Sequence, residues 1–147
     1  MEEQPRTLQL FSFGEAQFAV FADEVMAVTE WREPAALPHA PAAVLGIVSI
    51  HGRMLTVLDL SQLLESPQRA GRPTHILALN GDEQLALAID APGETFAIAA
   101  TNSEDAPASG KLVSGVINRN GDEIKILNVR ELFPTAIQGR ERRRRRF

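Results

Sequence analysis

Short runs of alternating apolar and polar residues, separated by glycine-containing turns, fill most of this 147-residue chain. Such alternation is typical of β-strands, because successive side chains of a strand point to opposite faces. Residues 8–13 and 17–21 predict a hairpin with Gly14 in its turn. Residues 46–60 predict a second hairpin around His51-Gly52-Arg53, followed by a single helical turn. The sequence therefore predicts a mainly β protein.

Between these hairpins the pattern changes. Asp23 is predicted to cap a short helix over residues 24–28, in which Val25 and Val28 share one face. Three prolines in residues 32–42 exclude any long helix there, because proline lacks an amide donor and restricts the residue before it.

The same plan occurs twice in the chain, at offsets of 67 and 69 residues. One hairpin cannot bury a core in water, so each unit must close on itself or pack on its twin. Two small β-barrels or half-barrels that share an apolar seam satisfy both demands. The matched positions are Gly14 with Gly81, Phe18 with Leu85, Val20 with Leu87, Asp23 with Asp90, Gly46 with Gly115, Gly52 with Gly121, Asp59 with Asn128 and Leu63 with Leu132.

The repeat suggests one domain over residues 1–139 with two subdomains, roughly 6–66 and 74–134, and it leaves open an exchange of strands between them. Asn120-Gly121 is a strong signal for a tight hairpin turn, because these residues tolerate positive φ angles. Residues 65–73 are expected to form a linker.

Composition narrows the function. The chain has no cysteine, which excludes disulfides and thiolate metal ligands. No run of apolar residues reaches the length that a bilayer requires, and no leader pattern is present, so an intracellular protein is expected. Residues 1–139 carry 9 basic and 18 acidic side chains, whereas residues 140–147 carry six Arg and one Glu. An acidic body argues against a main surface that follows nucleic acid.

The repeated stretch resembles the CheW-like coupling domain of bacterial chemosensory systems. The features that carry the resemblance are a Gly-containing apolar run with Asp-Leu at its end, the opening hairpin, the Asp23-Glu24-Val25 start and the proline-bearing loop of residues 37–41. It covers residues 6–134. Within this family, the chain could correspond to an accessory CheW-like protein of a Frz-type motility pathway.

The resemblance implies two five-stranded, SH3-like β-barrels on a common hydrophobic core with short helical turns. It also implies a non-enzymatic cytoplasmic adaptor without a cofactor, which binds no small-molecule substrate. The implied partners are the cytoplasmic tip of a methyl-accepting chemoreceptor, the regulatory domain of a CheA-type histidine kinase and other CheW-like proteins. By position, the implied receptor-groove residues are Val25, Val28, Gly46, Ser49, His51 and Gly52.

Three positions depart from the family pattern, which usually has Arg at His51, Asn at Ser49 and Pro at Thr56. Neutral histidine offers one donor, whereas arginine offers a planar charged fork. Loss of a charge-assisted bond of about 1.5–3 kcal/mol would weaken binding roughly 10- to 150-fold. The resemblance therefore suggests a specialised coupler.

Other chemistry is weakly indicated. His39, His51 and His75 lie on different predicted elements without a metal-ligand spacing, so no metal site is expected. Ser49, His51 and Asp59 lack a nucleophile elbow, so catalysis is not expected. The single Trp31 is expected to fill the core rather than anchor a partner.

The arginine run is the sharpest feature outside the resemblance. It is expected to be a solvated, disordered tail. Its other interpretations are contacts with nucleic acid phosphates, with anionic lipid or with an acidic protein surface, including the chain's own body. A small-barrel protein that binds nucleic acid through this tail is the alternative function, although so acidic a body disfavours nucleic acid as a partner. The residues concerned are Arg140, Arg142, Arg143, Arg144, Arg145 and Arg146.

Overall fold

The computed structural model describes residues 6–64, 72–98 and 112–137. Within these ranges the chain forms mostly strands, with α1 (Leu60–Leu63), two single 3₁₀ turns, η1 (Ala22–Glu24) and η3 (Val129–Glu131), and helical residues 132–137. The strands are β1 (Arg6–Phe13), β2 (Ala16–Phe21), β3 (Val25–Glu30), β4 (Val44–Ile50), β5 (Arg53–Leu58), β6 (His75–Leu79), β7 (Leu85–Ile89), β8 (Ala91–Ile98), β9 (Val113–Arg119) and β10 (Asp122–Leu127).

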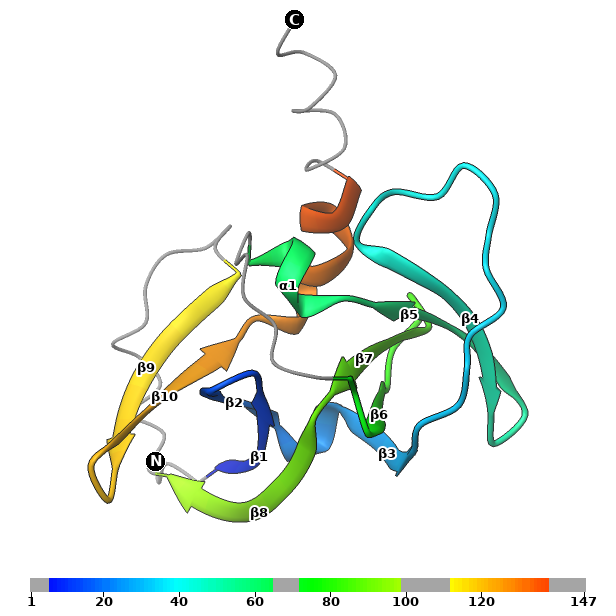
Figure 1. Ribbon diagram of the computed structural model, residues 1–147. Coiled ribbons are helices and arrows are strands. Elements are labelled where there is room, and N and C mark those ends of the chain that lie inside the picture. Colours follow the sequence, from blue (N-terminus) through cyan, green and yellow to red (C-terminus); the bar gives the residue numbers. More distant parts are fainter. Residues whose placement is uncertain (1–5, 65–71, 99–111, 138–147) are drawn as a thin grey trace, which may run out of the picture.

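The strands form two five-stranded sheets with the same internal plan. Sheet A has the order β8-β1-β2-β10-β9, and sheet B has the order β3-β6-β7-β5-β4. In each sheet the one parallel contact joins a strand of an opening hairpin to a strand of a closing hairpin, β2 with β10 and β7 with β5. Figure 1 shows the sheets side by side, with the helical residues 132–137 between them. This architecture confirms the predicted fold class of two similar five-stranded units.

Each sheet combines strands from both halves of the sequence. The hairpin β1–β2 joins the late strands β8, β9 and β10, and the hairpin β6–β7 joins the early strands β3, β4 and β5. The sheets therefore do not coincide with the ranges 6–66 and 74–134. Neither range alone contains all the strands of either sheet.

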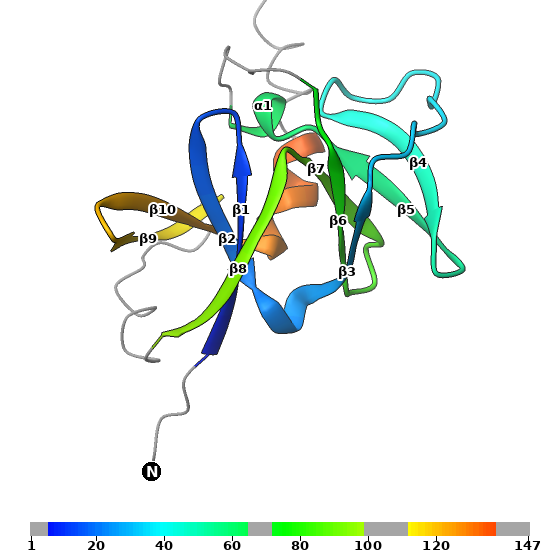
Figure 2. The ribbon, with the colours of Figure 1, turned by 60° about the horizontal axis from the view of Figure 1, so that its bottom comes forward.

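A shared core fills the seam between the sheets, and each sheet also covers a small core of its own. β7 shows how one strand serves two cores, because all five of its residues are buried. Leu85, Leu87 and Ile89 pack into the shared core, whereas Ala86 and Ala88 pack into the core of sheet B. The large residues thus fill the seam, and the small residues face the confined interior of one barrel. Figure 2 shows β7 and the helical residues 132–137 at this seam.

The predicted helix over residues 24–28 is wrong. The helical part is only the turn η1, and β3 then pairs antiparallel with β6. A bulge at Met26 adds one residue to β3, so Val25 and Val28 both face the shared core although they are three residues apart. The bulge therefore produces the spacing of a helical face within a strand.

Two further local expectations can be compared with the structure. Trp31 is half-buried and packs against the core of sheet B, as expected for a core residue. The pattern of residues 95–98 predicts a strand that begins at Thr95, whereas β8 begins four residues earlier, because Pro92 and Gly93 in its first half are atypical of strands. β8 is the edge strand of sheet A, where a residue without an amide donor is tolerated.

The two terminal helical turns are capped alike. Asp59 is 8% exposed, and its Oδ1 accepts hydrogen bonds from Ser61 N at 3.0 Å and Ser61 Oγ at 2.8 Å. At the matched position, Asn128 Oδ1 accepts a hydrogen bond from Arg130 N at 3.2 Å. Both side chains satisfy amides that a helix start leaves without a partner.

None of the helices formed by the described residues has the length and the apolar character of a membrane span.

Candidate functional site

The β4–β5 hairpin carries three of the sequence-predicted contact residues at or near its tip. His51 and Gly52 form its two-residue turn, with φ angles of 51° and 79°, and both are exposed. Two positive φ angles are the mark of the tight turn that suits the twist of a hairpin. Asn120 and Gly121 form the matching turn between β9 and β10, with φ angles of 55° and 86°.

Ser49 lies on the outer face of this hairpin. Its side chain is exposed, and its neighbours Val48 and Ile50 point the other way into the core of sheet B. Directly across the hairpin stands Met54, which is 58% exposed. The Ser49 carbonyl accepts a hydrogen bond from Arg32 Nη1 at 2.7 Å, which holds a guanidinium beside the strand.

Gly46 has a structural role in the same strand. It is buried, its φ is +148°, and the Pro34-Ala35 segment crosses directly over it. Ala35 and Ile47 exchange two backbone hydrogen bonds of 2.9 Å each. A Cβ on Gly46 would lie 2.8 Å from the Ala35 carbonyl carbon and 2.9 Å from Pro34 Cβ. Glycine is therefore required for the chain to pack against β4 at this point.

Val25 and Val28 occupy a different part of the molecule. They lie on β3, which is the opposite edge of sheet B from β4 in hydrogen-bonded order. Both are half-buried and pack against the shared core. The predicted contact residues therefore fall into two groups, one at the seam between the sheets and one along the β4–β5 hairpin. The arginine run of residues 140–147 lies outside the described residues.

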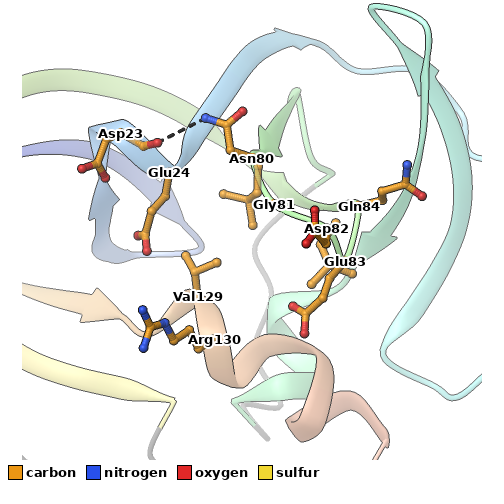
Figure 3. A pocket seen from close by; sticks show the side chains of 11 residues that line it. Asp23, Glu24, Asn80, Gly81, Asp82, Glu83, Gln84, Val129 and Arg130 are labelled. Carbon is orange, nitrogen blue, oxygen red and sulfur yellow. Dashed lines mark hydrogen bonds between the residues drawn. The ribbon is translucent and has the colours of Figure 1, made fainter.

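A pocket of about 400 Å³ opens at the seam, next to Val25. We call it the seam pocket. Its walls come from three segments that are distant in sequence: the crossing from sheet A to sheet B, the β6–β7 turn, and η3. Figure 3 shows Glu24 on one side, Asp82 and Glu83 on the other, and Val129 and Arg130 along a third. The lining residues are Asp23, Glu24, Leu79, Asn80, Gly81, Asp82, Glu83, Gln84, Leu85, Val129 and Arg130.

Hydrogen bonds fix the rim of the seam pocket. Asn80 Nδ2 donates to the Asp23 carbonyl at 3.2 Å (Figure 3). Asn80 N donates to the Glu24 carbonyl at 2.8 Å. Arg53 Nη2 donates to the Gly81 carbonyl at 3.0 Å, so the base of the β4–β5 turn is tied to the β6–β7 turn. The β6–β7 turn is therefore held on one side by η1 and on the other by β5.

The carboxyl of Glu24 is the electrostatically unusual group of this pocket. Burial raises its pKa above the ordinary value of 4.5, and nearby Asp23 raises it further. The Phe21 backbone amide, Arg6 and Arg130 act in the opposite direction. Oε1 of Glu24 is buried, and no donor among the described residues forms a hydrogen bond with it.

Sequence reasoning missed the seam pocket as a site. The sequence places Glu24 at the start of a predicted helix and in the Asp23-Glu24-Val25 start of the family resemblance, and it marks Asp82 and Glu83 only as residues that follow the turn glycine Gly81. The available signal was the recurrence of Gly-Asp-Glu, at residues 81–83 and again at 121–123. That signal does not reveal which turn faces another segment.

The described residues contain no cluster of three or more histidine, aspartate or glutamate side chains that could hold a metal ion. The carboxylate of Asp59 is committed to the start of α1 through Ser61, while His51 stands exposed at the hairpin tip. Within residues 6–64, 72–98 and 112–137 the geometry thus offers surfaces and a pocket rather than a nucleophile with its base.

Comparisons with known proteins agree with this architecture. The chain is 26% identical over 139 residues to the chemotaxis protein CheW of Rhizobium meliloti (strain 1021), with 88% of each chain covered. It is 31% identical over 64 residues to a probable chemotaxis protein CheW of Rhizobium etli, covering 44% of this chain and 41% of that protein. The fold is shared with the scaffolding protein TtCheW from Thermoanaerobacter tengcongensis, with a TM-score of 0.72, 20% identity, and 85% and 90% of the two chains covered. Because the family model of the CheW-like domain matches residues 7–136, the chain belongs to the CheW-like family and is a CheW-like scaffold or adaptor of chemotaxis signalling.

Proposed function

We propose that this protein is a non-enzymatic cytoplasmic adaptor that couples the cytoplasmic tip of a methyl-accepting chemoreceptor to a CheA-type histidine kinase. In this proposal it acts within a chemosensory array, beside other CheW-like proteins, and it needs no cofactor. The observation that carries the proposal is the family match, which spans nearly all of the described chain. The pair of exchanged five-stranded sheets supports it, because half-buried apolar residues such as Val25 and Val28 lie at the seam between the sheets.

The proposed receptor contact runs from the seam to the β4–β5 hairpin. Val25 and Val28 contribute half-buried apolar surface at the seam. Ser49, His51 and Met54 are exposed along the hairpin, where a partner can reach them without displacing any strand. Arg53 links the two regions through its hydrogen bond to the β6–β7 turn.

His51 is the residue that we expect to set the strength of this contact. Histidine tolerates the left-handed backbone conformation found at this position, so the turn can hold His51 whether or not its side chain contacts a partner. An arginine at this position would offer five donors and a fixed charge. We therefore propose that the adaptor binds its receptor more weakly than a coupler with arginine here.

The test is a binding titration of the purified protein with a helical receptor-tip fragment and, separately, with the kinase regulatory domain. Met54→Glu removes an exposed apolar side chain and adds a charge at the proposed contact. Burial of a large apolar side chain is worth about 1.5–3 kcal/mol, so the variant should bind the receptor fragment on the order of tenfold or more weakly. The matched control is Val116→Glu, because Val116 is 49% exposed on the edge strand β9, outside the proposed contact.

His51→Arg gives the opposite arm of the same titration, and it should strengthen receptor binding. An unchanged affinity would remove His51 from the contact, and equal losses for the two glutamate variants would show that the hairpin is not the contact surface. Absence of binding to both partners at low ionic strength would contradict the proposed function as a whole. A chain without residues 140–147 should keep its protein partners, whereas a nucleic-acid binder would lose its ligand.

A further inference from the structure

The seam pocket combines an apolar floor with an acidic rim. Leu79, Leu85 and Val129 line its interior. Asp23, Glu24, Asp82 and Glu83 contribute four carboxylates to its described lining, whereas Arg130 is the single arginine of that lining. The guanidinium of Arg53 lies at the rim, where it donates to the Gly81 carbonyl.

Much of this acidic charge is uncompensated. Asp23 is paired with Arg6 at 3.3 Å, but Asp82 and Glu83 are exposed and form no ion pair with any described residue. Oε1 of Glu24 is a buried acceptor that no described donor reaches. These groups lie on opposite sides of the pocket in Figure 3, so a single elongated cation could approach both.

The group that fits such a pocket is an arginine side chain. Its aliphatic stem packs on apolar surface while its charged head stays at a polar rim. Its planar fork of donors bonds carboxylates in two directions, which an ammonium group matches less well. A pocket of about 400 Å³ accepts side chains of a partner segment but not a whole helix.

We propose that the arginine-rich segment of this same chain, residues 140–147, docks in the seam pocket and inserts a guanidinium between Glu24 and the Asp82-Glu83 turn. Charge complementarity favours this occupant. Residues 140–147 carry six Arg and one Glu, while the preceding 139 residues carry twice as many acidic as basic side chains. A segment of net charge +5 is thus tethered to a body of net charge −9.

The reach of the chain permits docking within one molecule. Val129 and Arg130 line the pocket, and the described residues end at Ile137. Seven residues at a helical rise of 1.5 Å carry the chain about 10 Å from Arg130. Three extended residues span about 10 Å, so Arg140 can already return to the pocket and the arginines after it have length to spare.

The experiment compares ¹H–¹⁵N spectra of the full chain and of a chain that ends at Ile137, both dilute and at low ionic strength. Docking should shift the backbone amides of residues 80–85 and of Arg130 more than any others. When both the full and the shortened chain carry Asp82→Lys and Glu83→Lys, the difference between their spectra should be several-fold smaller. In about 1 M salt, where charges are screened beyond about 3 Å, the difference should also shrink.

The sequence supplies a matched control. Asp122 and Glu123 also follow a turn glycine and are exposed, but they belong to the β9–β10 hairpin outside the seam pocket. Their double change to lysine should leave the shifts of residues 80–85 in place. The spectrum of each variant also reports whether it is folded, so a loss of docking is distinguishable from a loss of structure.

Three results would overturn the proposal. The first is identical spectra for the full and shortened chains at residues 80–85. The second is a shift that follows the Asp122-Glu123 pair instead of the pocket. The third is a pocket shift that disappears on dilution, because docking between two copies depends on concentration and docking within one chain does not.

Discussion

Replacement of Gly46 by alanine tests how the outer segment is held on sheet B. The added Cβ would lie 2.8 Å from the Ala35 carbonyl carbon and 2.9 Å from Pro34 Cβ. Both atoms belong to the segment between β3 and β4, which contains prolines at positions 34, 38 and 41, so relief requires this segment to move away from β4. That movement would break the two hydrogen bonds between Ala35 and Ile47.

The magnitude follows from these two losses and from the backbone conformation. Each backbone hydrogen bond contributes about 0.5–1.5 kcal/mol, and a residue held in a sparsely populated φ region costs about 1–3 kcal/mol. We expect Gly46→Ala to lower the free energy of unfolding by about 3 kcal/mol, or roughly 150-fold in the equilibrium constant. For a chain of this size the midpoint of thermal unfolding should fall by about 6–12 °C.

Denaturant and thermal unfolding of Gly46→Ala and Gly52→Ala, side by side, separate steric overlap from backbone strain. Gly52 also has a positive φ, of +79°, but no atom lies within 4 Å of its added Cβ. Its replacement should cost only the left-handed conformation, about 1–2 kcal/mol. Equal losses in the two variants would refute the conclusion that the Pro34-Ala35 segment packs on Gly46.

Three further outcomes are expected. In denaturant titrations, Asp59→Ala should lower the free energy of unfolding by about 1 kcal/mol or more. Asp59→Asn should cost less, because it keeps the amide oxygen acceptor found at Asn128. Equal losses in the two variants would contradict the capping role of Asp59. Because burial raises the pKa of Glu24 in the folded protein, protonation favours folding, and this stabilisation is present below pH 4.5 and lost as the pH rises through the raised pKa. In the chain that ends at Ile137, Glu24→Gln should therefore gain stability relative to the parent at pH 7 but not at pH 4, and a pH-independent difference would contradict this sign. Fragments 1–68 and 69–147 should each lack cooperative unfolding alone and recover it when mixed; a fragment that folds alone would contradict the exchange of strands.

The fold was largely predictable because the sequence repeats its hairpins. Gly52 and Gly121 mark two turns of the same type, and the matched caps at Asp59 and Asn128 mark two equivalent helix starts. These are local features, and local patterns determine them. The helix predicted for residues 24–28 is wrong for a related reason. The bulge at Met26 places Val25 and Val28 on one face of a strand, and this spacing is the one expected of a helix.

The seam pocket was not predictable in this way. Its walls meet only after β2 crosses into β3, β6 turns into β7, and β10 runs into η3. Hydrophobic alternation specifies which face of a strand is buried, but it does not specify which strand lies beside it. The parallel pairings of β2 with β10 and of β5 with β7 are long-range contacts, and no short motif encodes them.

The exchange of strands makes each sheet depend on both halves of the sequence. β3 pairs only with β6 among the described strands, and β8 pairs only with β1, so each half of the sequence completes the sheet of the other. The shared core takes side chains from both sheets, so it forms only when both halves of the sequence are folded. In the proposed function, a receptor tip at this seam contacts a surface that folding of the chain has already formed, so little ordering entropy opposes its binding.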